Sequence, residues 1–169
     1  MVLFDVRMFL IQTYEVQDCK WYHTLTDSSA ESHLITTGIT YSYTSNGLSV
    51  SNGNWKDLLI TVPITKGMSI EYDITSVGGG ATPKAYVGFF NSASQGNTGL
   101  TNYEPNATGH MKTVYNTDGT VQCWLDTTLM TDVVSSSTSP TLTDDPVYLK
   151  LNTGGNRTFT IKNMKIKPL

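Results

Sequence analysis

The sequence predicts an all-β fold, an antiparallel β-sandwich or jelly roll of about ten strands. Thr, Ser, Asn and Gly make up 66 of the 169 residues and only 15% of residues are charged, whereas helical bundles need Ala, Glu, Lys and Leu in bulk. Apolar and polar residues alternate along many short segments, which is the period of a strand with one buried face. Three Trp, nine Tyr and five Phe supply the apolar burial that disordered chains lack.

The length fits one domain. We expect residues 1–20 to form an N-terminal strand or docking segment and residues 21–169 to form a single sandwich domain. The segment 3–11 is apolar on both faces, so it needs cover on both sides, either as a central strand or by adding to a partner. It lacks a signal peptide's basic region and cleavage site, and it is too short to span a bilayer.

Alternation and turn residues then predict the remaining elements in order. Residues 17–35 are polar and turn-rich. Strands are expected at 39–43, 48–50, 57–62, 68–75, 85–90, 111–115, 121–125, 129–134, 147–151 and 159–166. Ser45-Asn46-Gly47 and 116–120 read as hairpin turns, because Asn-Gly and Asp-Gly tolerate positive φ. The longest irregular stretches are 91–110 and 135–145.

The charge of the chain indicates which class of partner it lacks. The net charge is −3, the pI is about 5.5 and there are only two Arg, so we expect no nucleic-acid partner. Lys162, Lys165 and Lys167 are expected to form the solvated side of the last strand.

The two cysteines, Cys19 and Cys123, leave two interpretations open. A disulfide between them would close a long loop, but spacing alone cannot fix its geometry. We expect two buried thiols instead. No CxxC pair suggests a zinc site.

Two segments bear a family resemblance. Residues 111–126 (MKTVYNTDGTVQCWLD) resemble the central hairpin of concanavalin A-like and laminin-G-like jelly rolls, and residues 159–166 (FTIKNMKI) resemble their last strand. The likeness covers about residues 35–169. It implies a jelly-roll fold, as in carbohydrate-binding modules, adhesins and phage tail or head-fibre attachment domains. By that resemblance we expect a place on a virion or cell surface.

The resemblance also bears on catalysis. Retaining β-glucanases of this fold carry a Glu-x-Asp-x-x-Glu strand, and here the matching run has Glu71 and Asp73 but Ser76 in the third acidic position. Glycoside hydrolysis needs two carboxyl groups in distinct roles. We therefore expect no catalytic residues, and we expect both acids to be solvated opposite a buried row at 68, 70, 72 and 74.

Aromatic residues provide the candidate ligand site. Trp124 lies on the same predicted strand face as Gln122 and Asp126, opposite Val121 and Cys123. The indole would stack on a pyranose while the amide and carboxylate bind its hydroxyls. The alternative is that Trp124 packs under a loop or against the N-terminal strand. Two further aromatic candidates, Trp55 and Tyr103, fall in a turn and a loop.

No cofactor is expected. His23, His33 and His110 sit in polar, turn-rich sequence and are expected to be exposed loop residues, so no metal site is predicted. Asp144-Asp145 could help to hold a structural calcium ion, but a plain acidic turn is favoured because EF-hand spacing is absent.

These observations predict a non-enzymatic attachment module that binds a surface glycan or polysaccharide. A protein partner or a homo-oligomer formed through the N-terminal strand is also expected, without membrane insertion. The alternatives are a purely structural virion or fibre subunit and, second, a glycoside hydrolase, which the residue at position 76 disfavours.

Overall fold

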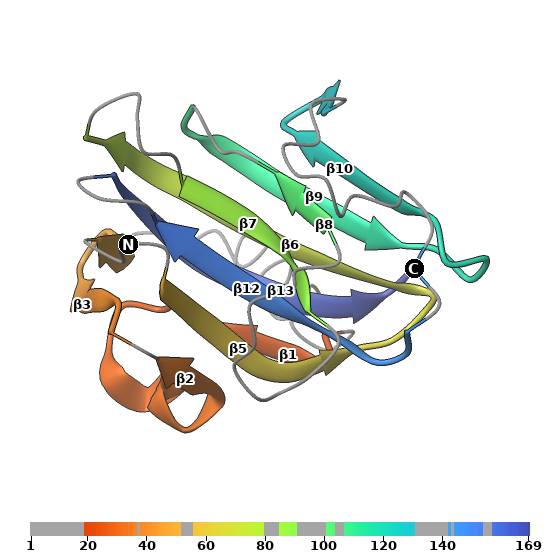
Figure 1. Cartoon of the computed structure of the whole chain (residues 1–169), viewed down its shortest axis with the longest axis horizontal. Coiled ribbons are helices and arrows are strands. Elements are labelled where there is room, and N and C mark those ends of the chain that lie inside the picture. Colours follow the sequence, from red (N-terminus) through yellow and green to blue (C-terminus); the bar gives the residue numbers. More distant parts are fainter. Residues whose placement is uncertain are drawn as a thin grey trace, which may run out of the picture.

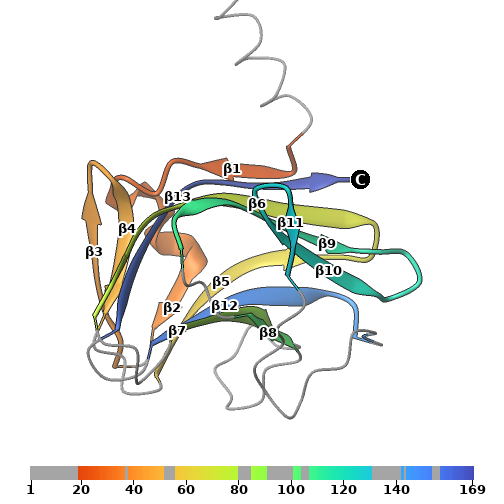
Figure 2. The same ribbon diagram turned by 90° about the horizontal axis from the view of Figure 1, so that it is seen from above.

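The computed structural model describes residues 19–36, 38–51, 56–79, 85–90, 101–103, 107–130, 142, 144–153 and 157–169. These residues form two antiparallel sheets packed face to face, with one short 3₁₀ helix, η1 (Ser28–His33) (Figures 1 and 2). The predicted β-sandwich is therefore confirmed. The described residues contain thirteen strands, so the prediction of about ten underestimated the number of strands.

The larger sheet has eight strands and the smaller has five. The larger runs in the order β11-β10-β9-β6-β13-β4-β3, with β1 also paired to β13. Its strands are β1 (Trp21–His23), β3 (Thr40–Thr44), β4 (Gly47–Ser51), β6 (Met68–Gly78), β9 (Gly109–Tyr115), β10 (Val121–Leu125), β11 (Thr128–Leu129) and β13 (Thr158–Pro168). The smaller runs β2-β5-β12-β7-β8, with β2 (Leu34–Thr36), β5 (Lys56–Ile64), β7 (Ala85–Phe90), β8 (Thr101–Tyr103) and β12 (Val147–Thr153).

Most predicted strands are confirmed, and the differences lie in short elements. The stretch expected to be turns contains β1, η1 and the start of β2, and the stretch expected to be irregular contains β8 and the first residues of β9. The strand expected at 129–134 is seen only as the two-residue β11, and positions 131–134 lie outside the described residues. The N-terminal segment 1–18 also lies outside them.

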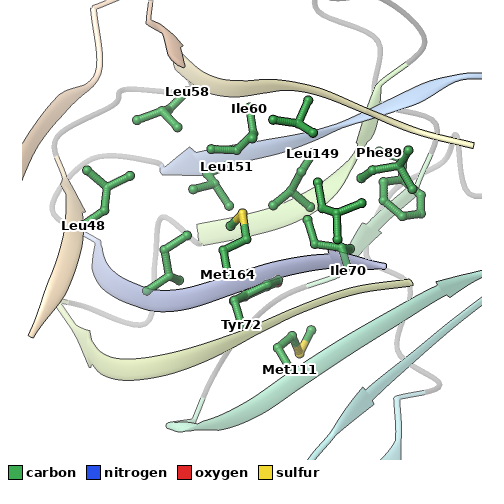
Figure 3. Packing of buried hydrophobic residues seen from close by; sticks show 14 of the residues in the cluster. Leu48, Leu58, Ile60, Ile70, Tyr72, Phe89, Met111, Leu149, Leu151 and Met164 are labelled. Atoms are coloured by element: carbon green, nitrogen blue, oxygen red, sulfur yellow. The ribbon is translucent and has the colours of Figure 1, made fainter. Parts of the chain in front are cut away.

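The core lies between the sheets and follows the predicted alternation. One face of β6 contributes Ile70, Tyr72 and Ile74, all 2% exposed or less. They meet side chains of β5 and β12 from the other sheet, as Figure 3 shows for Ile60, Leu149 and Leu151. Burial of this kind is the main stabilising contribution to the fold, at about 25 cal/mol for each Å² of apolar surface.

Local turn chemistry fixes the hairpins as predicted. The Asn116 amide donates to the Thr120 carbonyl at 2.9 Å, and Gly119 between them has φ +89°. The carboxylate of Asp118 accepts from the Thr120 amide and hydroxyl at 2.9 and 2.7 Å. In the other predicted turn, Gly47 follows Asn46 and has φ +123°. A Cβ there would lie 2.1 Å from the Ile161 carbonyl oxygen, so only glycine fits.

The two cysteines form no disulfide, as expected. Cys19 is half-buried beside β1, which corrects the expectation that both thiols are buried. Cys123 is buried in the core, where its sulfur lies 3.2 Å from the Thr113 hydroxyl. Burial raises the pKa of this thiol to about 12, because a thiolate would lose its hydration.

Two buried tyrosines give a matched test of core packing. The Tyr72 hydroxyl is buried with no hydrogen-bond partner, whereas the Tyr115 hydroxyl donates to the Asp144 carbonyl. Because an unpaired buried hydroxyl costs about 1–3 kcal/mol, Tyr72→Phe should raise the free energy of unfolding by about 1 kcal/mol. Tyr115→Phe should lower it by a similar amount. Urea unfolding of both variants measures this, and a loss of stability in Tyr72→Phe would contradict it.

Candidate functional site

A row of side chains crosses the outer face of the eight-stranded sheet. Trp124, Lys112, Glu71, Lys165 and Tyr22 lie directly opposite one another on β10, β9, β6, β13 and β1. Residues paired in this way point to the same side of a sheet. Their chain neighbours Cys123, Met111, Tyr72 and Met164 point into the core instead. We call the five outward-facing residues, Trp124, Lys112, Glu71, Lys165 and Tyr22, the cross-strand row.

Trp124 lies as the alternation predicted. It is half-buried and faces away from the core, with the exposed Gln122 two residues before it on the same face. Across the strands it is flanked by Lys112 on β9 and by Leu129 on β11, which is 47% exposed. An aromatic ring in this position offers a flat apolar surface edged by polar groups.

Asp126 has a structural task that the sequence did not reveal. It follows the end of β10 with φ +53°, and its backbone amide donates to the His110 carbonyl at 2.7 Å. Its carboxylate accepts from the His110 amide at 2.8 Å. One carboxylate oxygen is therefore engaged in holding β10 to β9, and a role in ligand binding stays a prediction.

Glu71 is buried, which corrects the expectation of a solvated acid. Its side chain is 8% exposed, yet it lies on the outer face rather than in the core. Its carboxylate lies 3.2 Å from the Lys167 ammonium and 3.8 Å from that of Lys112. The His110 ring nitrogen Nε2 is also 3.8 Å away. A buried carboxylate is tolerated when cations surround it in this way.

Asp73, which is half-exposed, belongs to the same cluster. Its Oδ1 lies 2.8 Å from Nδ1 of His110, and its Oδ2 accepts from the Asn163 amide at 2.8 Å. Burial opposes ionisation of Asp73, but these two hydrogen bonds outweigh it and lower the pKa below the ordinary value. His110 therefore lies in β9 with two carboxylates beside it, not in an exposed loop.

The other two aromatic candidates cannot be placed in this site. Trp55 lies outside the described residues. Tyr103 ends β8 in the five-stranded sheet, and its side chain lies outside the described part of the chain. Both assignments stay predictions.

The glucanase-like strand lacks the geometry for hydrolysis at its third position. A register shift in the β6–β13 pairing keeps Ser76 exposed, opposite Thr160. A hydroxyl there cannot supply the second carboxyl role. The first carboxylate, Glu71, is occupied by ion pairs.

A second group looks catalytic but is structural. Nε2 of His23 lies 2.8 Å from the Ser29 hydroxyl, which donates to Asp27. However, Nδ1 of His23 accepts from the Leu25 amide at 2.8 Å, so the proton of the neutral ring sits on Nε2. The imidazole thus donates to Ser29 and cannot take its proton as a general base would.

The other two histidines also differ from the expectation of loop residues. His23 belongs to β1, and His33 ends η1 with its ring edge-on to Trp21 at 5.7 Å. Across the described ranges, no three His, Cys, Asp or Glu side chains are grouped to hold a metal ion. The Asp144-Asp145 pair caps a turn, where Asp145 accepts from the Lys66 amide at 3.3 Å. No helix in the described chain has the length and apolarity needed to cross a membrane.

The five-stranded sheet carries a different polar group on its outer face. Asp57 accepts from the Asn152 amide at 2.6 Å and lies 3.8 Å from the Lys150 ammonium. All three residues are at most 8% exposed. Burial lowers the pKa of Lys150, and the Asp57 charge opposes that shift. Sequence alternation missed this group, which ties β5 to β12 and offers little surface to a ligand.

Comparison with solved structures gives the fold a context. The carbohydrate binding module CBM66 from Bacillus subtilis is 15% identical, with a TM-score of 0.55 over 80% of this chain and 95% of its own. A protein of unknown function with a galectin-like fold from Bacillus subtilis is 11% identical, with a TM-score of 0.61 over 89% and 96%. The Crh5 transglycosylase in complex with NAG is 11% identical, with a TM-score of 0.59 over 88% and 83%.

The chain has the jelly-roll sandwich fold of the concanavalin A-like type. At these identities the likeness establishes the fold and not the activity. No model of a known protein family matches the chain, and no curated protein does.

The Asp73 cluster predicts an acid-sensitive contribution to stability. Because the pKa of Asp73 is lowered on folding, its stabilising effect is present above the unfolded pKa of about 3.9 and is lost as pH falls through the folded value. Asp73→Asn should therefore lose stability at pH 7 but lose less than the wild type on acidification. Thermal melts between about pH 7 and pH 2.5 measure this. Parallel pH curves for the two proteins would contradict it, and Ser76→Ala on the same face is the control.

Proposed function

We propose that the protein is a non-enzymatic module that binds a surface glycan through the outer face of its eight-stranded sheet. The observation that carries the proposal is the half-exposed Trp124, which faces outward beside the hydrogen-bonding side chains of Gln122 and Lys112. Ligand sites commonly combine an aromatic surface with a few polar groups that fix orientation.

The chemistry of a pyranose fits this arrangement. One side of the ring presents C–H groups, which would pack on the indole of Trp124. The hydroxyls at the ring edge would reach the Gln122 amide, the Lys112 ammonium and the Asp126 carboxylate. The sandwich-fold carbohydrate binding module CBM66 supports this assignment by analogy of fold.

The acids on the same face support binding without cleavage. Glu71 is held by the ammonium groups of Lys112 and Lys167, and position 76 carries a hydroxyl. A general acid needs a proton to give at neutral pH, which requires a raised pKa, whereas the pKa of Asp73 is lowered. The transglycosylase neighbour therefore shares the fold but is not a guide to activity here.

The module would serve attachment on a virion or a cell surface. Its hydroxyl-rich, charge-poor exterior supports a role as an exposed module, and the segment 3–11 would join it to a partner or to another copy by strand addition.

Substitution of Trp124 tests the glycan face. On a glycan array, Trp124→Ala should bind at least about tenfold more weakly, because it removes a central aromatic anchor. Trp124→Phe should keep part of the binding, since a smaller ring remains. The control is Ile35→Ala, which removes a 37% exposed apolar side chain from the other sheet. Equal binding by Trp124→Ala and the wild type would contradict the proposal.

Removal of residues 1–12 tests the docking segment. The truncated chain should become monomeric while it still binds glycan, because the buried cluster of the described residues runs from Leu25 to Ile166. Light scattering measures the mass in solution. The docking role is wrong if the full chain and the truncated chain have the same assembly state.

A further inference from the structure

The cross-strand row is long and has an aromatic residue at each end. Trp124 lies on β10 and Tyr22 lies on β1, with three strands between them. At a strand spacing of about 4.8 Å, the two rings are separated by about 19 Å across the sheet. Tyr22 faces outward like Trp124, because its neighbours Trp21 and His23 stack on the opposite side. A single sugar cannot reach both rings, but an extended chain can.

Between the two rings, the positive charges lie nearer the surface than the negative charge of Glu71. Lys112 and Lys167 have side chains that are 43% and 36% exposed, while the Glu71 carboxylate that they share is 8% exposed. Lys165 lies opposite Glu71, and Lys162 lies opposite Asp73. A ligand lying on this face would therefore meet ammonium groups before it met the buried carboxylate.

The remaining acids on this face are engaged in hydrogen bonds. Asp73 is bound by His110 and Asn163, and Asp126 is bound by the His110 amide. Among the described residues, this face carries Lys112, Lys162, Lys165 and Lys167 against Glu71, Asp73 and Asp126, a surplus of one positive charge in a chain whose net charge is −3. The cationic surplus is thus local, and it lies along the track between the two rings.

From this arrangement we infer that the ligand is an extended polysaccharide bearing carboxylate or sulfate groups, which lies across the strands from Trp124 to Tyr22. This inference rests on the proposed glycan-binding function and adds the charge and the direction of the ligand. A ring would stack at each end, and anionic groups between them would pair with Lys112 and Lys165. A nucleic acid fits less well, because the described residues of this face include no Arg for phosphate and no closely spaced aromatic residues for stacked bases.

Dextran and dextran sulfate provide a matched pair of probes that differ only in charge, and alginate supplies the carboxylate case. In titration calorimetry the wild type should bind dextran sulfate and alginate at least about tenfold more tightly than dextran in about 50 mM NaCl, and this preference should shrink in about 500 mM NaCl because salt screens exposed charges. Similar affinity for charged and neutral polymers, or no effect of salt, would overturn the inference.

Lysine substitutions test whether the row itself supplies the charge. Lys112→Gln with Lys165→Gln should weaken dextran sulfate binding about tenfold. Lys20→Gln with Lys66→Gln removes the same net charge away from the row, and it should leave binding nearly unchanged. Equal losses in the two double variants would show that only overall charge matters. Circular dichroism checks that both variants are folded.

The other end of the row is tested by Tyr22→Ala. This change should weaken binding of the long polymers while leaving a short, charged disaccharide unaffected, because the disaccharide reaches only Trp124. Tyr148→Ala, on the outer face of the other sheet, is the control. Equal loss for polymer and disaccharide would contradict a ligand that spans the row.

The outcomes separate the inference from the proposed function. Trp124-dependent binding of neutral glycans alone would leave the function standing and overturn the anionic ligand. Binding to no glycan of either kind would overturn both. Equally strong competition by single-stranded DNA would replace the polysaccharide with a nucleic acid.

Discussion

Antiparallel pairing between β6 and β13 is the constraint on which the larger sheet depends. Nine residue pairs join the two strands, and β13 also holds β4 and β1 along its other edge. Because strand side chains alternate, this register places Ile70 and Ile166 in the core and Glu71 and Lys165 on the outer face. A slip of one residue would exchange the two sets and destroy both the core and the row.

Sequence alternation predicted the long strands and the hairpin turns because their signals are local. It also predicted which way Trp124 and Gln122 face, since one strand is enough to decide that. It could not predict β1, because this strand pairs with β13, which is far along the chain. The burial of Glu71 was missed for the same reason, because its cations come from β9 and β13 and are set by the order of strands in the sheet. The outward lysines at 162, 165 and 167 were the signal that could have suggested a shared face.

The outer face of the larger sheet divides into two surfaces of different chemistry. On β3, Thr40, Ser42 and Thr44 are exposed, as the composition predicted. Farther along the sheet, lysines, acids and aromatic rings replace the hydroxyls. The hydroxyls keep this part of the sheet hydrated without adding charge. Because β3 adds no charge to this face, the field over the cross-strand row is set mainly by the lysines and acids around it.

The burial of Cys123 has a consequence for its reactivity. Its thiol is shielded in the core with its pKa raised, so it exchanges slowly with external thiols. A reagent reaches this thiol only when the core opens, so the rate of its modification reports on unfolding.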